Sequence, residues 1–167
     1  MNKNILLLLF LIFTCLSYGQ KVEIDSTDTL IFNDKKVSLD LTRDELKEVF
    51  GNPDRITLKH NIIWTYDELG FMIYIKPQTL KIMNITINFK KETHDFSPKE
   101  KFKGTLIIFG SVVTEYTTSA GLKSIEKEAI KRNRPPVYSI KTSNHSMHFF
   151  QDEKMKSELS GCEINLI

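Results

Sequence analysis

Cysteine is scarce in this 167-residue sequence, which contains only Cys15 and Cys162. Cys15 lies in the leading apolar segment, so loss of that segment leaves one cysteine and excludes an intramolecular disulfide. Cys162 alternates with Ile164 and Leu166, as residues on the buried face of one strand do. Because no basic residue adjoins it to activate the thiol, we expect a buried core residue rather than a reactive cysteine.

The sequence also lacks an excess of either charge. It has 23 Lys and Arg against 21 Asp and Glu, and residues 1–19 include Lys3 but no acid. A chain shortened by those residues therefore carries 22 basic and 21 acidic side chains. Nucleic-acid binding needs a concentrated positive field, so we expect no nucleic-acid partner.

Long apolar runs are missing except at the N-terminus. Ile5–Phe13 is an unbroken apolar stretch preceded by a lysine, and small residues follow up to Gly19. This order predicts a cleavable bacterial signal peptide at residues 1–19, because a membrane-spanning helix needs about 20 apolar residues. We expect an exported protein, periplasmic or secreted, that keeps no membrane span after cleavage. Lipidation of Cys15 is the alternative.

Signatures of catalysis are absent too. No Gly-x-Ser-x-Gly elbow, phosphate loop or dinucleotide fingerprint occurs. His145 and His148 are three residues apart in a predicted strand, so they should point to opposite faces and cannot share a metal ion. His60 and His94 stand alone in polar loops. We expect a protein that is not an enzyme and binds no cofactor and no metal.

A short helix is the clearest element that is present. Thr42 and Glu45 have the spacing of a capping box, in which each side chain satisfies the other residue's backbone amide. Gly51 and Pro53 then favour an end to the helix. The sequence predicts a helix over Thr42 to Phe50.

Strands are predicted on both sides of this helix. Residues 29–33 and 36–40 form one expected hairpin, and 61–66 with 71–76 form another. Residues 83–89 alternate between apolar and polar side chains, which is typical of a strand with one buried face.

A similar order of elements follows in the second half. We expect a hairpin at 105–109 with 112–116, followed by a helix near 120–132. Three closing strands should follow at 137–141, 146–150 and 161–166. The spacing of about 76 residues suggests an internal duplication, although any chain of this class offers a hairpin before a helix more than once. The predicted organisation is a first α+β repeat at 20–90, a linker or long loop at 91–103, and a second repeat at 104–167 packed against the first.

These elements predict an α+β fold. An antiparallel sheet would be layered against two helices, in a tandem repeat of a hairpin, a helix and three strands.

Two motifs add a family resemblance. The helix ends in Phe-Gly-Asn-Pro-Asp-Arg at residues 50–55, and a strand carries Trp-Thr-Tyr-Asp at residues 64–67. This pair resembles the β-lactamase-inhibitor-protein-like repeat, also found in the small lipoprotein of the outer-membrane β-barrel assembly machinery. A longer run, which includes Gly70-Phe71, Pro77 and the segments 96–98 and 102–104, is similar to an uncharacterised bacterial domain family over about residues 29–120. The resemblance implies a layered α/β fold and a binding surface, with no catalytic residue to transfer.

Aromatic residues near the second motif suggest where a partner would bind. Trp64 and Tyr66 share one strand face, Tyr74 lies on the next strand, and Asp67 and Glu68 lie at the rim. Such aromatics are most often core residues, but Trp and Tyr also dominate contact hot spots. We predict a non-enzymatic, exported protein-binding module of the bacterial envelope with these five contact residues. The alternatives are an inhibitor or immunity protein against a toxin or hydrolase, and a small hydrolase with an unrecognised site.

Overall fold

A computed structural model describes residues 19–125, 130–131, 138–152 and 157–167. The predicted signal peptide, apart from Gly19, therefore lies outside the described residues. So does the middle of the predicted second helix.

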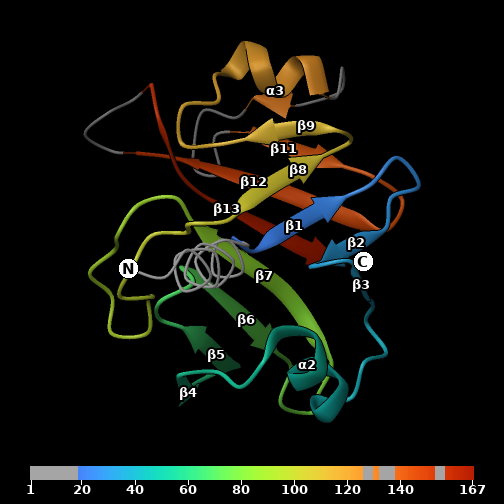
Figure 1. The fold of residues 1–167 in the computed structure, drawn as a ribbon, viewed down its shortest axis with the longest axis vertical. Coiled ribbons are helices and arrows are strands. Elements are labelled where there is room, and N and C mark those ends of the chain that lie inside the picture. The colour runs from blue at the N-terminus through green and yellow to red at the C-terminus, as the bar shows by residue number, and fades with distance from the viewer. Residues whose placement is uncertain (1–18, 126–129, 132–137, 153–156) are drawn as a thin grey trace, which may run out of the picture.

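The described chain forms two β-sheets (Figure 1). The five-stranded sheet has the order β3 (Lys35–Val37), β2 (Leu30–Phe32), β1 (Lys21–Ile24), β8 (Thr105–Ile108), β9 (Ser111–Val113). The eight-stranded sheet has the order β10 (Ile130–Lys131), β11 (Tyr138–Lys141), β12 (His145–Gln151), β13 (Leu159–Leu166), β7 (Ile82–Asn88), β6 (Phe71–Ile75), β5 (Ile62–Tyr66), β4 (Arg55–Leu58).

The predicted α+β class is wrong. Strands hold 43% of the described residues and helices only 11%, and the fold is a β-sandwich-like pair of sheets. The reason is β1, which was not predicted. It pairs antiparallel with β2 and parallel with β8, so it joins the two hairpins into a sheet of their own. That sheet, with α3 (Ser119–Ile125) beyond one edge and α2 (Arg43–Phe50) beyond the other, lies across one face of the larger sheet (Figure 1).

The predicted first helix is confirmed as α2. Glu45 N donates to Thr42 Oγ1 at 3.3 Å, and Thr42 N donates to Glu45 Oε2 at 2.7 Å, which completes the capping box. Gly51 ends the helix with φ 82°. The predicted second helix is too long, because Ile130 and Lys131 form a strand that pairs with β11.

The order hairpin, helix, four strands occurs twice along the chain. β2–β3, α2 and β4 to β7 form the first series, and β8–β9, α3 and β10 to β13 form the second. Each series contributes four strands to the larger sheet, rather than the three predicted, and β7 pairs antiparallel with β13 where the two series meet. A duplication at residues 20–90 and 104–167 remains a prediction.

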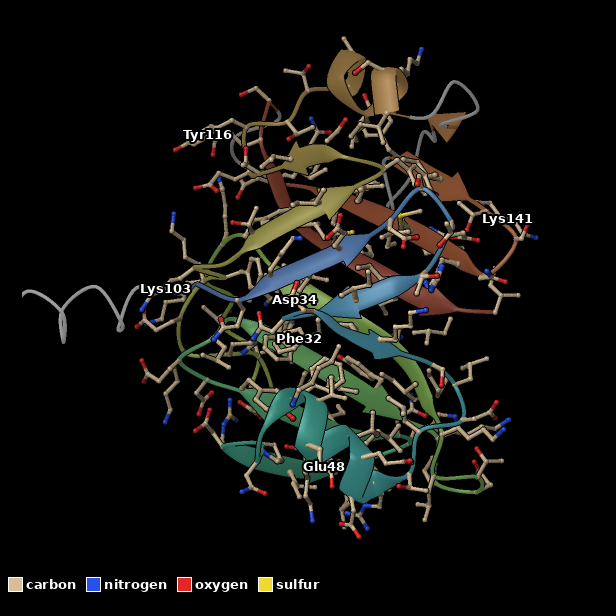
Figure 2. All side chains as sticks on the ribbon, turned by 45° about the vertical axis from the view of Figure 1, so that its right-hand side comes forward. Phe32, Asp34, Glu48, Lys103, Tyr116 and Lys141 are labelled. Carbon is tan, nitrogen blue, oxygen red and sulfur yellow. The ribbon has the colours of Figure 1, made fainter. Side chains whose placement is uncertain are left out.

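The core lies between the layers. Phe32 of β2, which is labelled in Figure 2, points into this core. Its ring packs against Phe50 of α2 and Phe71 of β6, with ring centroids 4.6 and 5.5 Å apart. This aromatic cluster joins both sheets and the helix. Cys162 is fully buried, as predicted, and burial raises the pKa of its thiol.

Candidate functional site

Two of the predicted contact residues belong to the core. Trp64 and Tyr66 are 0% and 1% exposed, so neither can contact a partner while the protein is folded. Tyr66 stacks on Phe71 at 4.4 Å, and its hydroxyl donates to Gly51 O at 3.1 Å. The prediction that Trp64 and Tyr66 share a face is right, but that face of the sheet is buried in the core.

Tyr74 points the other way. It lies opposite Ile63 in the β5–β6 ladder, one residue beyond the Trp64–Ile73 pair, so it occupies the outer face of the sheet. The side chain is half-buried, and burial, followed by the nearby Glu163 carboxylate, raises the pKa of its phenol. The structure therefore separates Tyr74 from the other two aromatics.

Asp67 is an ionic anchor. Its carboxylate is 4% exposed and accepts from Arg55 Nε at 3.0 Å and Arg55 Nη2 at 2.7 Å. Lys99 Nζ lies 3.3 Å from the same carboxylate. The hydrogen bond from Arg55, opposed by burial and supported by Lys99, holds the pKa of Asp67 below its usual range. The Asp67 carboxylate is therefore bound by Arg55 and Lys99 of the same chain rather than presented to a partner.

The same network holds the segment predicted as a linker. Arg55 donates to the carbonyl oxygens of Asp95 and Ser97, and Thr65 Oγ1 donates to Phe96 O at 2.9 Å. Residues 95–97 therefore lie over the outer face of β4 and β5, and they bury Thr65.

Gly70 completes this arrangement. It has φ 76°, and a side chain there would meet the backbone of Phe102 at 2.1 Å. The turn after β5 thus needs glycine both for its conformation and for the close passage of residues 101–102. The residues of the two motifs have structural roles: they end a helix, pair two strands and fix a long loop.

What remains exposed in this region is the edge of the larger sheet. β4 is the terminal strand, with β5 on one side and no described strand on the other. Ile56 and Leu58 are 49% and 75% exposed, and Ile56 lies opposite Trp64 in the ladder. Because these residues are two apart, both side chains extend the apolar inner face beyond its last strand. Glu68, in the β5–β6 turn, is also exposed.

The other well-described edges differ from β4. β3 presents Lys35 and Lys36, both exposed, and charged side chains on an edge strand oppose pairing with another chain. β9 exposes one apolar residue, Val112, at 57%. β4 is thus the edge that combines a free strand with two neighbouring apolar side chains.

Sequence reasoning missed β4, although a signal was present. Ile56 and Leu58 alternate with Arg55, Thr57 and Lys59, which is the period of a strand. The stretch is short and falls between the end of a helix and a longer apolar strand, so it is easily taken for a connecting loop.

Metal binding finds no support in the described ranges, where no group of three or more His, Cys, Asp or Glu side chains is placed to hold an ion. His145 and His148 lie on opposite faces of β12, as predicted: His145 bonds to Asp28 between the sheets, and His148 Nδ1 lies 2.9 Å from Ser139 Oγ.

Comparison with known proteins gives a family but no activity. A sequence model described as a domain of unknown function matches residues 21–123, from β1 into α3. No curated protein gives a significant match. An extracellular protein containing a SCP domain from Bacillus anthracis is similar in structure, with a TM-score of 0.47 and 10% identity. The match covers 74% of this chain and 42% of that one, so the chain spans less than half of that protein's length.

These findings confirm the resemblance to an uncharacterised domain family, and they give no support to the β-lactamase-inhibitor-protein-like repeat. Among the described residues, no helix has both the length and the apolar character to cross a membrane.

Proposed function

This chain belongs to the family described as Domain of unknown function (DUF7738), which assigns it no activity, and we propose that the protein is an exported, non-enzymatic binding module. Its contact surface is the free edge of β4, which we call the β4 edge: Ile56, Leu58 and the outward backbone of Arg55–Leu58. The ligand is an extended segment of a protein partner, which adds a strand to the eight-stranded sheet.

The exposure of Ile56 and Leu58 on a terminal strand carries this proposal. Edge strands present unpaired backbone groups that another strand can satisfy, and natural proteins usually protect such edges with charge. In β-strand addition the backbone bonds supply affinity, and alternate side chains supply specificity. The β4 edge offers both, with two apolar side chains on the same face.

The size of the interaction suits a reversible partner. Full burial of an Ile or Leu side chain contributes about 1.5–3 kcal/mol. Because Ile56 is 49% and Leu58 75% exposed, covering both would contribute roughly 2–4 kcal/mol before the costs of association. Further affinity has to come from the backbone bonds and from contacts beside the edge, where Glu68 is exposed at the neighbouring turn.

The proposed setting is the bacterial envelope or the extracellular space, as the apolar segment Ile5–Phe13 predicts. An inhibitor or immunity protein would be a special case of the same function, in which the partner is a toxin or a hydrolase. The β4 edge would serve either partner in the same way.

The experiment compares three forms of residues 20–167 as immobilised bait for envelope and culture-supernatant proteins of the source cells. The forms are the wild type, the double variant Ile56→Lys/Leu58→Lys, and Val112→Lys. Val112 is a matched control, because it is an exposed apolar residue on an edge strand of the other sheet. Surface changes of this kind should leave stability within about 0.5 kcal/mol of the wild type, which urea unfolding checks.

We expect the wild type and Val112→Lys to retain the same protein in stoichiometric amount, and the double variant to lose it. Equal retention by all three forms, or no retained protein from any fraction, contradicts the proposal.

A further inference from the structure

A second polar site joins the two sheets at the end of the sandwich where the β1–β2 turn meets the β11–β12 turn. The Asp28 carboxylate lies 2.8 Å from His145 Nδ1. Thr142 Oγ1 donates to the same carboxylate at 2.8 Å, and Asn144 N donates at 2.7 Å. The His145 side chain is only 5% exposed, so its orientation is fixed by these neighbours.

These contacts determine which histidine nitrogen carries the proton. Burial opposes ionisation of Asp28, but hydrogen bonds from His145, Thr142 and Asn144 together hold the pKa of Asp28 below its ordinary value. An ionised carboxylate can only accept hydrogen bonds, so Nδ1 is the donor. In the neutral ring, Nε2 is then an acceptor with a free lone pair.

Nε2 of His145 has no hydrogen-bond partner among the described residues, and it is not sealed from solvent. His145 lines a cavity of about 300 Å³ that is open to solvent at this end of the sandwich. Half of the other lining residues are aliphatic, and the rest are polar and include Asp28, Ser38 and Asp40. The aliphatic ones are Leu30, Val37, Leu39, Leu166 and Ile167. The cavity thus combines aliphatic walls with a free acceptor on a nearly buried ring.

A purely structural role accounts for only one of the two ring nitrogens of His145. Tying the two sheets together requires the bond from Nδ1 to Asp28 and nothing from Nε2. A buried ring with a free acceptor at a cavity wall is the arrangement of ligand sites, which are mostly apolar with few polar groups that fix orientation.

The surrounding charge and the volume restrict the ligand. Asp28 lines the cavity and carries no lysine or arginine partner in the described part of the chain, so an anion is disfavoured. Asp40 also lines it, but its charge is offset by Lys81 Nζ at 2.6 Å. An apolar cavity of about 150 Å³ holds benzene, so one of about 300 Å³ accommodates a substituted ring or a compact branched molecule.

We propose that this cavity binds a small neutral molecule with a compact apolar body and one hydroxyl or N–H group, which donates a hydrogen bond to Nε2 of His145. Nothing in the proposal depends on the β4 edge, because the cavity lies at the β1–β2 and β11–β12 turns. It assigns His145 as the orienting residue and the aliphatic walls as the source of affinity.

The test uses two probes that differ in one hydrogen-bond donor. 4-Methylphenol and its methyl ether, 4-methylanisole, are titrated separately into ¹⁵N-labelled residues 20–167 and followed by the backbone amides of Leu39, Asn144 and Leu166 and the ring nitrogens of His145. We expect the phenol to bind in the millimolar range and to shift the Nε2 resonance. The ether should bind about tenfold more weakly, since it leaves Nε2 without a donor.

Two variants check the location. Ser38 is exposed at the rim of the cavity, so Ser38→Trp should cover it and abolish binding. Lys36→Trp places the same side chain on an exposed position of β3 and should leave binding unchanged. Equal affinities of the two probes for the wild type, or shifts confined to residues outside the cavity, overturn the proposal. The comparison of the two probes on the unaltered protein tests the proposal even if a variant does not fold.

Discussion

Arg55 and Asp67 form a two-point ion pair at the start of the β4–β5 hairpin: Nε donates to Oδ2 at 3.0 Å, and Nη2 donates to Oδ1 at 2.7 Å. The ion pair engages the carboxylate of Asp67, which the sequence analysis had predicted to contact a partner. It also places Arg55 to bind the carbonyl oxygens of Asp95 and Ser97. One ion pair thus fixes a hairpin and the loop that crosses it.

Replacement of Asp67 should be strongly destabilising. Asp67→Ala leaves Arg55 without its charged partner at a site where the carboxylate was 4% exposed. Loss of one member of a buried pair costs about 3–5 kcal/mol, and because Arg55 is 32% exposed, this pair falls below that range. We expect a loss of about 2 kcal/mol in the free energy of unfolding, measured in urea. Glu68→Ala, one residue along and exposed, should change it by less than about 0.5 kcal/mol. Similar values for the two variants would show that the pair has no stabilising role.

The same pair should make the protein sensitive to acid. The folded pKa of Asp67 lies below its ordinary value of 3.8. The stabilisation is therefore fully present above the unfolded pKa of 3.8, and it is lost as the pH falls below that value and through the lower folded pKa. The free energy of unfolding should fall across this pH range, and less steeply for Asp67→Asn than for the wild type. Parallel profiles would mean that Asp67 does not contribute to acid sensitivity.

Gly70 should be irreplaceable for a steric reason. Gly70→Ala would place a methyl group 2.1 Å from Phe102 N, in addition to the strain of φ 76°. Gly110 is the matched control, because it has φ 79° and nothing within 4 Å of an added side chain. We expect Gly110→Ala to cost about 1 kcal/mol and Gly70→Ala at least about 3 kcal/mol. Equal costs in thermal or urea unfolding would contradict the close contact with residues 101–102.

Cys162 should be chemically silent in the folded protein. It is 0% exposed and its thiol pKa is raised by burial. A colorimetric thiol reagent should react with residues 20–167 only after addition of denaturant. Rapid stoichiometric reaction without denaturant would place the thiol at the surface.

Local signals were enough to predict some elements. The Thr42–Glu45 capping box and Gly51 define α2 within ten residues of sequence, so no distant contact had to be known. The predicted hairpin of residues 29–33 and 36–40 is similar: it turns at Asn33 and Asp34, which both have positive φ, as a two-residue hairpin turn requires.

Sheet membership could not be read in this way. β1 is four residues long, and its partners β2 and β8 are separated by more than 70 residues along the chain. Alternation along the strand predicts two faces, but it does not say that β1 joins two hairpins into a separate sheet. The predicted single sheet covered by helices failed at this point.

The contact residues failed for a related reason. Trp64 and Tyr66 share a face, yet Thr65 between them is also buried, because Phe96 and its neighbours cover the outer side. When a strand is buried on both sides, its sequence does not alternate clearly between polar and apolar residues, so the sequence does not show which side faces the core. The edge residues Ile56 and Leu58 could be identified only once β4 was seen to be the last strand.

Site-specific photo-crosslinking in the source cells tests the central claim most directly. A photoreactive phenylalanine replaces Leu58 on the β4 edge or, as a control, Val112 on β9, and the protein is irradiated in the intact envelope. The account predicts a discrete adduct with one protein from position 58 and none from position 112. No adduct at position 58, or the same adduct in equal yield from both positions, would contradict it.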